Sequence, residues 1–372
     1  MSAFTLAATA TFGLESVVGA ELEALGLGGL SVENGQVVFH GDEADIARCS
    51  LWLRSADRLL VRLAEFEAAG SDDIYGGVRS IPWRDFLPRT ARVAVNAKSV
   101  RASVGVPTIQ SVGKKAVVDA MAIGRLEETG PLYPVLISLS GGRATVTLDA
   151  SGDGLHKRGY RTEAGEAPLK ETLAAGMVLL SRWDPSRPFA DPLCGSGTLP
   201  IEAALIGANA APGLSRSFAA ERWPHIGADA WRLAREEARA AVKSGPVSIS
   251  ASDRDARVLE YAGRNAERAG VKLSIDFRCV EVSRLRLQGD YGCIVTNPPY
   301  AERLGGEREA GAVSRDLGRL FQDLPTWSLF ALSANPEFER TFGLRATKNR
   351  KLYNGNIRCH LHQYFGPLPP RT

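Results

Sequence analysis

The chain has few of the residues that mark disulfide-rich, zinc-binding or membrane-spanning proteins. Its five cysteines are odd in number among 372 residues, and no two form a Cys-x-x-Cys pair. We therefore expect no disulfide framework and no metal site, and a reducing cytoplasm fits. The longest apolar stretches, such as residues 131–139, fall well short of the ~20 residues that cross a bilayer, so no membrane partner is expected. No Lys or Arg precedes a hydrophobic run at the N-terminus, which argues against a secretory signal.

The composition is that of a folded globular protein with unevenly spread charge. Hydrophobic residues make up 44% and charged residues 23%, which excludes disordered and fibrous classes, and the length suits two or three domains. Residues 1–88 hold 6 basic and 13 acidic side chains, whereas residues 89–161 hold 11 and 5. Residues 340–372 add seven basic side chains and no acidic one. This separation predicts a basic face that could meet phosphates, although accidental clustering on a solvated surface would look the same.

Hydrophobic periodicity predicts two small α+β units before residue 165. The first, residues 1–69, has expected strands at 4–10, 36–40 and 61–66 and expected helices at 14–25 and 42–53. The second, residues 70–165, has expected strands at 92–97, 135–140 and 144–149 and an expected helix at 109–123.

The segment 151–161, SGDGLHKRGYR, closes the second unit and mixes cations with an aromatic ring. Such a mixture is typical of single-stranded nucleic-acid binders, so it makes four residues candidates for RNA binding: Lys157, Arg158, Tyr160 and Arg161. The alternative is a polar linker or hinge between domains.

From residue 166 to the end, helices and strands alternate in the manner of a doubly wound parallel sheet. Expected helices cover 169–180, 199–206 and 256–269, and expected strands cover 189–190, 247–251, 275–280 and 292–296.

The segment 189–204, FADPLCGSGTLPIEAA, predicts a ligand site at the edge of this sheet. A strand ends in Asp191, glycines 195 and 197 allow close backbone approach, and a helix starting near Thr198 offers free N–H groups. Pro200 stands where a dinucleotide fingerprint would have its third glycine, so a dehydrogenase fits poorly.

An acidic residue after the next strand adds to this site. A carboxylate at Asp253, in SASDRDA, can accept both hydroxyls of a ribose. Either Asp253 or Asp255 could instead cap the helix that follows. We assign Asp253 to the ribose and Asp255 to the cap.

The tetrapeptide Asn297-Pro298-Pro299-Tyr300 directly follows the expected strand 292–296. The Asn297 side-chain oxygen and the Pro298 carbonyl could accept the two hydrogens of an exocyclic amine, while Tyr300 stacks on the base. Such a clamp points the amine lone pair at an electrophile and needs no strong base. A merely structural turn is the alternative, and the upstream glycine loop argues against it.

Both motifs together resemble the class I S-adenosylmethionine-dependent methyltransferases that act on exocyclic amines. The wider match resembles the bacterial THUMP-domain RNA methyltransferases, which include ribosomal large-subunit and tRNA guanine-N2 methyltransferases and are often labelled N6-adenine-specific DNA methylases. The resemblance covers almost the whole chain and is carried by these segments: 149–161, 167–171, 191–198, 211–214, 297–304 and 351–355.

The resemblance implies a ferredoxin-like unit, a THUMP domain and a Rossmann-like methyltransferase domain that takes S-adenosylmethionine as cofactor. It implies that Asp253 holds the ribose and that Glu281 lies near the adenine, where the family usually has Asp. The other cofactor-binding positions that it implies are Asp191, Cys194, Gly195, Ser196, Gly197, Thr198 and Asn297. A catalytic thiol at Cys194 is disfavoured, because a small side chain suits the tight glycine loop.

The leading function is methylation of guanine N2 in RNA, either 23S rRNA or tRNA, with Asn297, Pro298 and Tyr300 as the catalytic residues. A DNA adenine-N6 methyltransferase is one alternative, but the extra mass lies N-terminal and only 72 residues follow Tyr300, which favours RNA. A non-catalytic RNA-binding or assembly protein is the other alternative. Guanine and adenine both present an exocyclic amine, so the base stays open at this point.

Overall fold

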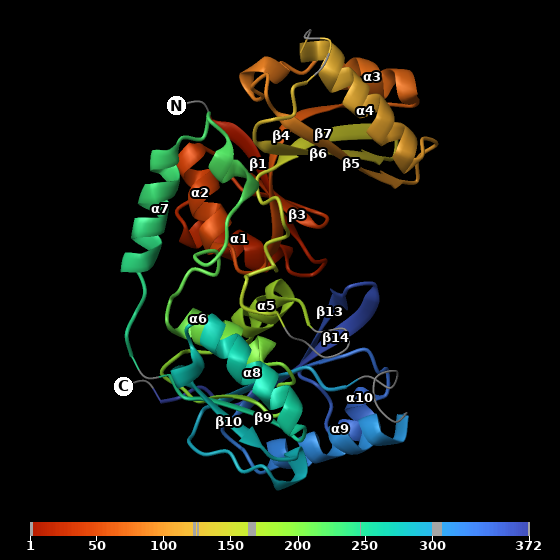
Figure 1. Cartoon of the computed structure of the whole chain (residues 1–372). Helices are drawn as coiled ribbons and strands as arrows, with labels where there is room; N and C mark the ends of the chain where they lie inside the picture. Colours follow the sequence, from red (N-terminus) through yellow and green to blue (C-terminus); the bar gives the residue numbers. More distant parts are fainter. Residues whose placement is uncertain are drawn as a thin grey trace.

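The computed structural model describes residues 3–121, 124, 126–162, 169–245, 247–299 and 307–370, which form two seven-stranded sheets (Figure 1). The first sheet begins with β1 (Phe4–Ala10), β2 (Ser31–Glu33), β3 (Gln36–Gly41) and β4 (Ala56–Glu67), joined by α1 (Glu15–Ala24) and α2 (Glu43–Trp52). The predicted strands and helices of this unit are confirmed. The short strand β2 was not predicted, because its three exposed residues show no apolar alternation.

The second unit adds α3 (Ser71–Arg79), β5 (Arg92–Val100), α4 (Val106–Met121), β6 (Leu132–Ser140) and β7 (Arg143–Asp149). Residues 122 and 123 of the predicted helix lie outside the described residues. Strand β7 pairs antiparallel with β4, so both units share one sheet of order β2-β3-β1-β4-β7-β6-β5. The boundary predicted at residue 69/70 thus falls just after β4, within a continuous sheet.

The second sheet confirms the predicted doubly wound architecture and extends it. Strands β8 (Phe189–Asp191), β9 (Ile249–Asp253), β10 (Ile275–Cys279), β11 (Cys293–Thr296) and β12 (Ser328–Ser333) are parallel. The hairpin of β13 (Lys348–Asn354) and β14 (Ile357–Tyr364) adds an antiparallel edge, which gives the order β10-β9-β8-β11-β12-β14-β13. Strand order reverses between β8 and β11, and open α/β sheets bind ligands beside such a reversal.

Helices flank this sheet on both faces (Figure 1). They are α5 (Glu171–Ser181), α6 (Thr198–Gly207), α8 (Ala256–Arg268), α9 (Glu307–Gln322) and α10 (Phe338–Phe342). The described residues also form short 3-10 helices η1 (Trp83–Asp85), η2 (Ala219–Arg222), η3 (Lys272–Ser274) and η4 (Val282–Arg284). None of the helices in these described ranges is both long and apolar enough to cross a membrane.

An insertion between α6 and β9 returns to the first sheet. Its helix α7 (Ala228–Ala240) lies beside α2, where Arg48 pairs with Glu237 at 3.3 Å (Figure 1). Ahead of α7, the buried Trp223 ring stacks on Tyr133 of β6 with centroids 5.0 Å apart, and its Nε1 donates to the Leu132 carbonyl at 3.0 Å. The insertion therefore fastens the two halves together.

Replacing Trp223 with Ala should weaken this fastening. Loss of a fully buried tryptophan and its stack should lower the free energy of unfolding by roughly 3–5 kcal/mol. Urea unfolding measures this loss. The control is Leu233→Ala on α7, whose side chain is exposed and whose removal should change stability by less than about 0.5 kcal/mol. A Trp223→Ala protein as stable as the control would contradict the assigned role.

Candidate active site

Asp191 closes β8 at the point where strand order reverses. Its side chain is buried, and Oδ1 accepts hydrogen bonds from the Thr296 hydroxyl at 2.7 Å and from the Leu193 N–H at 3.2 Å. Because Thr296 is the last residue of β11, the first bond joins the carboxyl ends of two neighbouring strands. Asp191 thus fixes the loop that follows it.

That loop needs its two glycines for different reasons. Gly195 has a φ of +53°, and its N–H donates to Asp253 Oδ2 at 3.0 Å. Gly197 has a φ of +87° directly before α6, and a Cβ there would lie 3.0 Å from the Cβ of Ala262. Left-handed backbone and close packing against α8 both exclude a side chain at Gly197. The loop therefore brings the backbone close to the cavity beside it.

Asp253 ends β9 and Asp255 follows it, and Asp255 is the helix cap, as predicted. Asp255 Oδ1 accepts from the N–H groups of Arg257 and Val258 and so caps α8. Asp253 uses one carboxylate oxygen for Asp255 N–H and the other for Gly195 N–H, and it lies on the wall of the cavity. Its position at the carboxyl end of β9 suits a ligand hydroxyl.

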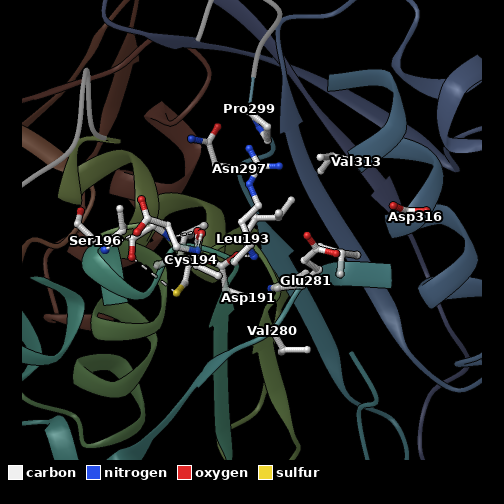
Figure 2. A pocket seen from close by; sticks show the side chains of 18 of the residues that line it. Asp191, Leu193, Cys194, Ser196, Val280, Glu281, Asn297, Pro299, Val313 and Asp316 are labelled. Carbon is white, nitrogen blue, oxygen red and sulfur yellow. Dashed lines mark hydrogen bonds between the residues drawn. The ribbon is translucent and has the colours of Figure 1, made fainter. Parts of the chain in front are cut away.

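These residues line a cavity of about 540 Å³, a size typical of small-ligand sites. Glu281, directly before η4, lies on its wall, as do Asn297 and Pro299 after β11. Figure 2 shows the glycine loop with Cys194 and Ser196 on one side, Glu281 and Val280 on another, and Asn297 beyond them. One cavity thus brings together residues 191–198, 253, 281 and 297, apart from Gly197, which shapes the wall without lining it.

Part of the wall was missed by sequence reasoning. Helix α9 contributes Glu309, Ala312, Val313 and Asp316, with Val313 and Asp316 opposite the glycine loop in Figure 2. No motif marks this helix, and its apolar positions were not recognised as a helical face. The ion pair of Glu309 with Arg254 at 2.5 Å fastens α9 to the segment after β9.

The structure describes three residues of the tetrapeptide 297–300, and they differ in whether they line the cavity. Asn297 and Pro299 face the cavity, whereas Pro298 is buried and does not line it. Tyr300 lies outside the described residues.

The predicted RNA-binding cluster needs correction, because most of it is internal. Arg158 is buried and faces Glu202 at 3.5 Å, and Tyr160, also buried, donates its hydroxyl to Glu202 at 2.9 Å. Arg161 pairs with the buried Glu171 at 2.7 Å. Only Lys157 is exposed, and it pairs with Asp153 at 2.7 Å. Sequence alone could not separate buried cations from surface ones, since the carboxylates that neutralise them come from α5 and α6.

Cys194 is placed in the loop as a packing residue. Its thiol is buried, burial together with Asp191 and Asp253 raises its pKa well above the ordinary value, and its N–H donates to the Ser252 carbonyl at 2.9 Å. A thiol held protonated is a poor nucleophile. This agrees with the expectation against thiol catalysis.

The wall fits S-adenosylmethionine. Carboxylates at Asp253 and Glu281 suit hydroxyl and amino groups, the apolar side chains of Leu193, Val280 and Val282 suit a purine ring, and the glycine loop leaves room for a polar chain. The fold and this site together define a class I methyltransferase, the enzyme class that draws its methyl group from that cofactor.

Comparisons with known proteins agree along the whole chain. Family models match as "RlmL ferredoxin-like domain" over residues 5–60, "THUMP domain" over 68–149 and "RMKL-like, methyltransferase domain" over 158–363. The Bacillus subtilis (strain 168) protein named "Putative RNA methyltransferase YpsC" is 45% identical over all of this chain and 98% of its own length. The chain belongs to the THUMP-domain family of RMKL-like methyltransferases with an RlmL-type ferredoxin-like domain.

Solved structures agree as well. A "predicted N6-adenine-specific DNA methylase" from Listeria monocytogenes is 44% identical with a TM-score of 0.93, over 99% of this chain and 97% of that one. SMU.472, "a putative methyltransferase complexed with SAH", is 39% identical with a TM-score of 0.93 over all of both chains. TrmN from Thermus thermophilus, 20% identical with a TM-score of 0.71 over 97% of this chain and 98% of that one, shares the fold.

The buried Asp191 should make stability depend on pH. Burial, with a smaller effect of Asp253, raises its pKa to about 7, against about 3.9 in an unfolded chain. The folded state favours the protonated form of Asp191, so the protein loses stability as the pH rises from about 3.9 to about 7. Between pH 5 and 8, Asp191→Asn should gain about 2–3 kcal/mol relative to the unaltered protein. Urea unfolding at both pH values tests this, and a difference independent of pH would contradict it.

Thiol reactivity offers a second test of the site. All five cysteines are described, and only Cys279 is exposed. Titration of the folded protein with a chromogenic disulfide reagent at pH 8 should therefore reveal one fast thiol, which Cys279→Ser removes. A second fast thiol that is protected by S-adenosylhomocysteine would identify a reactive Cys194 and restore thiol catalysis as a candidate.

Proposed function

We propose that this protein is an S-adenosylmethionine-dependent RNA methyltransferase that methylates an exocyclic amine, with guanine N2 in 23S rRNA or tRNA as its target. The observation that carries the proposal is that Asn297 lies on the wall of the same cavity as Asp253 and the glycine loop. A hydrogen-bond acceptor for an amine, Asn297, and a carboxylate suited to a nucleoside, Asp253, therefore share one small site.

The chain's own residues would perform binding and orientation. The cofactor, when bound, supplies an electrophilic methyl group. Asp253 would accept the hydroxyls of its ribose, and Glu281 would lie near its adenine. The Asn297 side-chain oxygen and the Pro298 carbonyl would accept the amine hydrogens of the target base, so that the nitrogen lone pair points into the cavity. No general base is required, because the amine becomes acidic only after it is alkylated and then releases its extra proton to water.

Two observations favour RNA as the substrate. The chain carries a THUMP domain and an RlmL-type ferredoxin-like domain ahead of the catalytic sheet. The Bacillus subtilis relative is named as an RNA methyltransferase and matches over the full chain. The Listeria relative's name instead refers to adenine N6 of DNA, which is also an exocyclic amine, so both names agree with the chemistry that we infer for Asn297.

The target can be read from a strain that lacks this protein. Mass spectrometry of nucleosides from its purified 23S rRNA and tRNA should show one missing N2-methylguanosine. The unaltered gene should restore it, and Asn297→Ala should not, while the purified variant still binds S-adenosylhomocysteine by calorimetry with affinity within a fewfold of the unaltered protein.

The alternatives give different results in the same experiment. Loss of N6-methyladenine from DNA would replace RNA by DNA as the substrate. Equal loss of methylation and cofactor binding in Asn297→Ala would make Asn297 structural, and an unaltered protein that does not bind the cofactor would favour the assembly role.

A further inference from the structure

A second cavity, of about 800 Å³, lies over the first sheet. Its wall includes Ser138 and Ser140 of β6 and Thr145 and Thr147 of β7. Side chains alternate between the two faces of a strand, and Ile137 lies against Gly113 of α4, so this wall is the face that α4 does not cover. We call this cavity the sheet groove.

The sheet groove carries uncompensated positive charge. Two of its cations are neutralised within the protein, since Arg58 pairs with Asp149 and Arg143 pairs with Glu65. Lys98 and Lys170 also line it, and neither stands in an ion pair in the described part of the chain. The Asp57 carboxylate, which accepts from the Thr11 and Thr172 hydroxyls, lines it as well, so one positive charge remains in excess. Unpaired lysines along a groove suit a phosphate backbone.

The sheet groove and the active-site cavity are both lined by the segment that leads into α5. Leu169 lines the active-site cavity, and the next residue, Lys170, lines the sheet groove. A strand whose phosphates pass Lys170 therefore reaches the chain segment that also forms part of the active-site wall.

One member of an aromatic pair also lines the groove. The Phe12 ring lines the groove and is 47% exposed, and it meets Tyr353 edge to face with centroids 6.0 Å apart. The Lys351 ammonium lies 5.3 Å from the centroid of each ring. In Figure 1 the hairpin of β13 and β14 reaches from the catalytic sheet towards the N-terminal strands, which places this trio at the junction of the two halves.

The position of Phe12 is set by its neighbours in the backbone. Gly13 has a φ of +94°, and a Cβ there would lie 2.4 Å from the Lys351 carbonyl oxygen, so the loop fits directly against β13. The Glu15 carboxylate accepts from the N–H groups of Gly13 at 2.7 Å and of Gly35 at 3.1 Å. An exposed aromatic ring on a fixed backbone loses little entropy when it binds a partner.

We propose that Phe12, Tyr353 and Lys351 form a stacking site for an unpaired base of the substrate RNA, next to the nucleotide that enters the active site. The flanking phosphates follow the sheet groove past Lys170 and Lys98. Flat rings with an adjacent cation are the groups that bind single-stranded nucleic acid without sequence preference. This inference rests on the proposed function, because it names a binding site for the same RNA.

The test compares two probes on the full chain. One is a fluorescein-labelled 15-nucleotide single-stranded RNA without self-complementarity, and the other is an oligomer of the same length made of abasic residues. Phe12→Ala should weaken binding of the RNA about tenfold and change binding of the abasic oligomer less than twofold, and Phe12→Trp should retain affinity. Lys98→Gln should weaken both probes and lower the salt dependence by about one counterion.

Controls separate stacking from folding. Phe365→Ala removes an equally exposed phenylalanine (52%) that lines neither cavity and should change neither probe. Urea unfolding and calorimetry with S-adenosylhomocysteine check that each variant is folded. If Phe12→Ala is not folded, Tyr353→Ala with Tyr353→Phe as its rescue takes its place.

The outcomes distinguish this inference from the proposed function. The protein could methylate RNA while Phe12→Ala binds the RNA probe as tightly as the unaltered protein does. This result would overturn the stacking site and leave the proposed function in place. An equal loss of affinity for both probes in Phe12→Ala would also overturn the stacking site, because the ring would then support the shape of the groove and would not stack on a base. An unaltered protein that methylates duplex DNA and does not bind the RNA probe would overturn both.

Discussion

The hydrogen bond from Thr296 to the buried Asp191 carboxylate joins the two strands on which the catalytic site depends. Strands β8 and β11 are parallel neighbours at the reversal of strand order, and each is followed by a loop that carries part of the site. One loop holds the glycines that shape the candidate cofactor cavity, and the other holds Asn297. By linking the last residues of both strands at 2.7 Å, this bond sets the distance between the two loops. The amide that would hold the target amine therefore cannot shift without shifting the loop opposite.

A buried polar cluster has a comparable role between the domains. Glu202 of α6 receives the hydroxyl of Tyr160 and faces the guanidinium of Arg158, which also donates to the Arg54 carbonyl in the first half of the molecule. Removing one member of such a cluster would leave a buried charge without compensation. The segment 151–161 is thus a fastening between domains, closer to the linker that its glycines indicated than to an RNA-binding surface.

The sequence predicted those parts of the molecule whose signal is local. Apolar periodicity located β1, β7 and α8, and the glycines at 195 and 197 located the cofactor loop because their backbone conformation excludes other residues. Asp255 was recognisable as a cap from its place before a helix. Helix α9 was missed, because its contribution depends on a long-range fold that brings it over the cavity. Burial of Arg158 and Tyr160 was missed for the same reason, since their partner Glu202 lies more than forty residues away.

The insertion that carries α7 has a mechanical consequence. The chain passes between the two halves three times: after β7, after α6 and again before β9. Three covalent segments cross this joint, and the contacts of Trp223 with β6 and of Glu202 with Tyr160 restrict rotation of one half against the other. The separation between the open face of the first sheet and the candidate active-site cavity is thereby restrained. In the function proposed above, such a restraint would favour a target nucleotide at a set distance along the polynucleotide from the part bound by the first sheet.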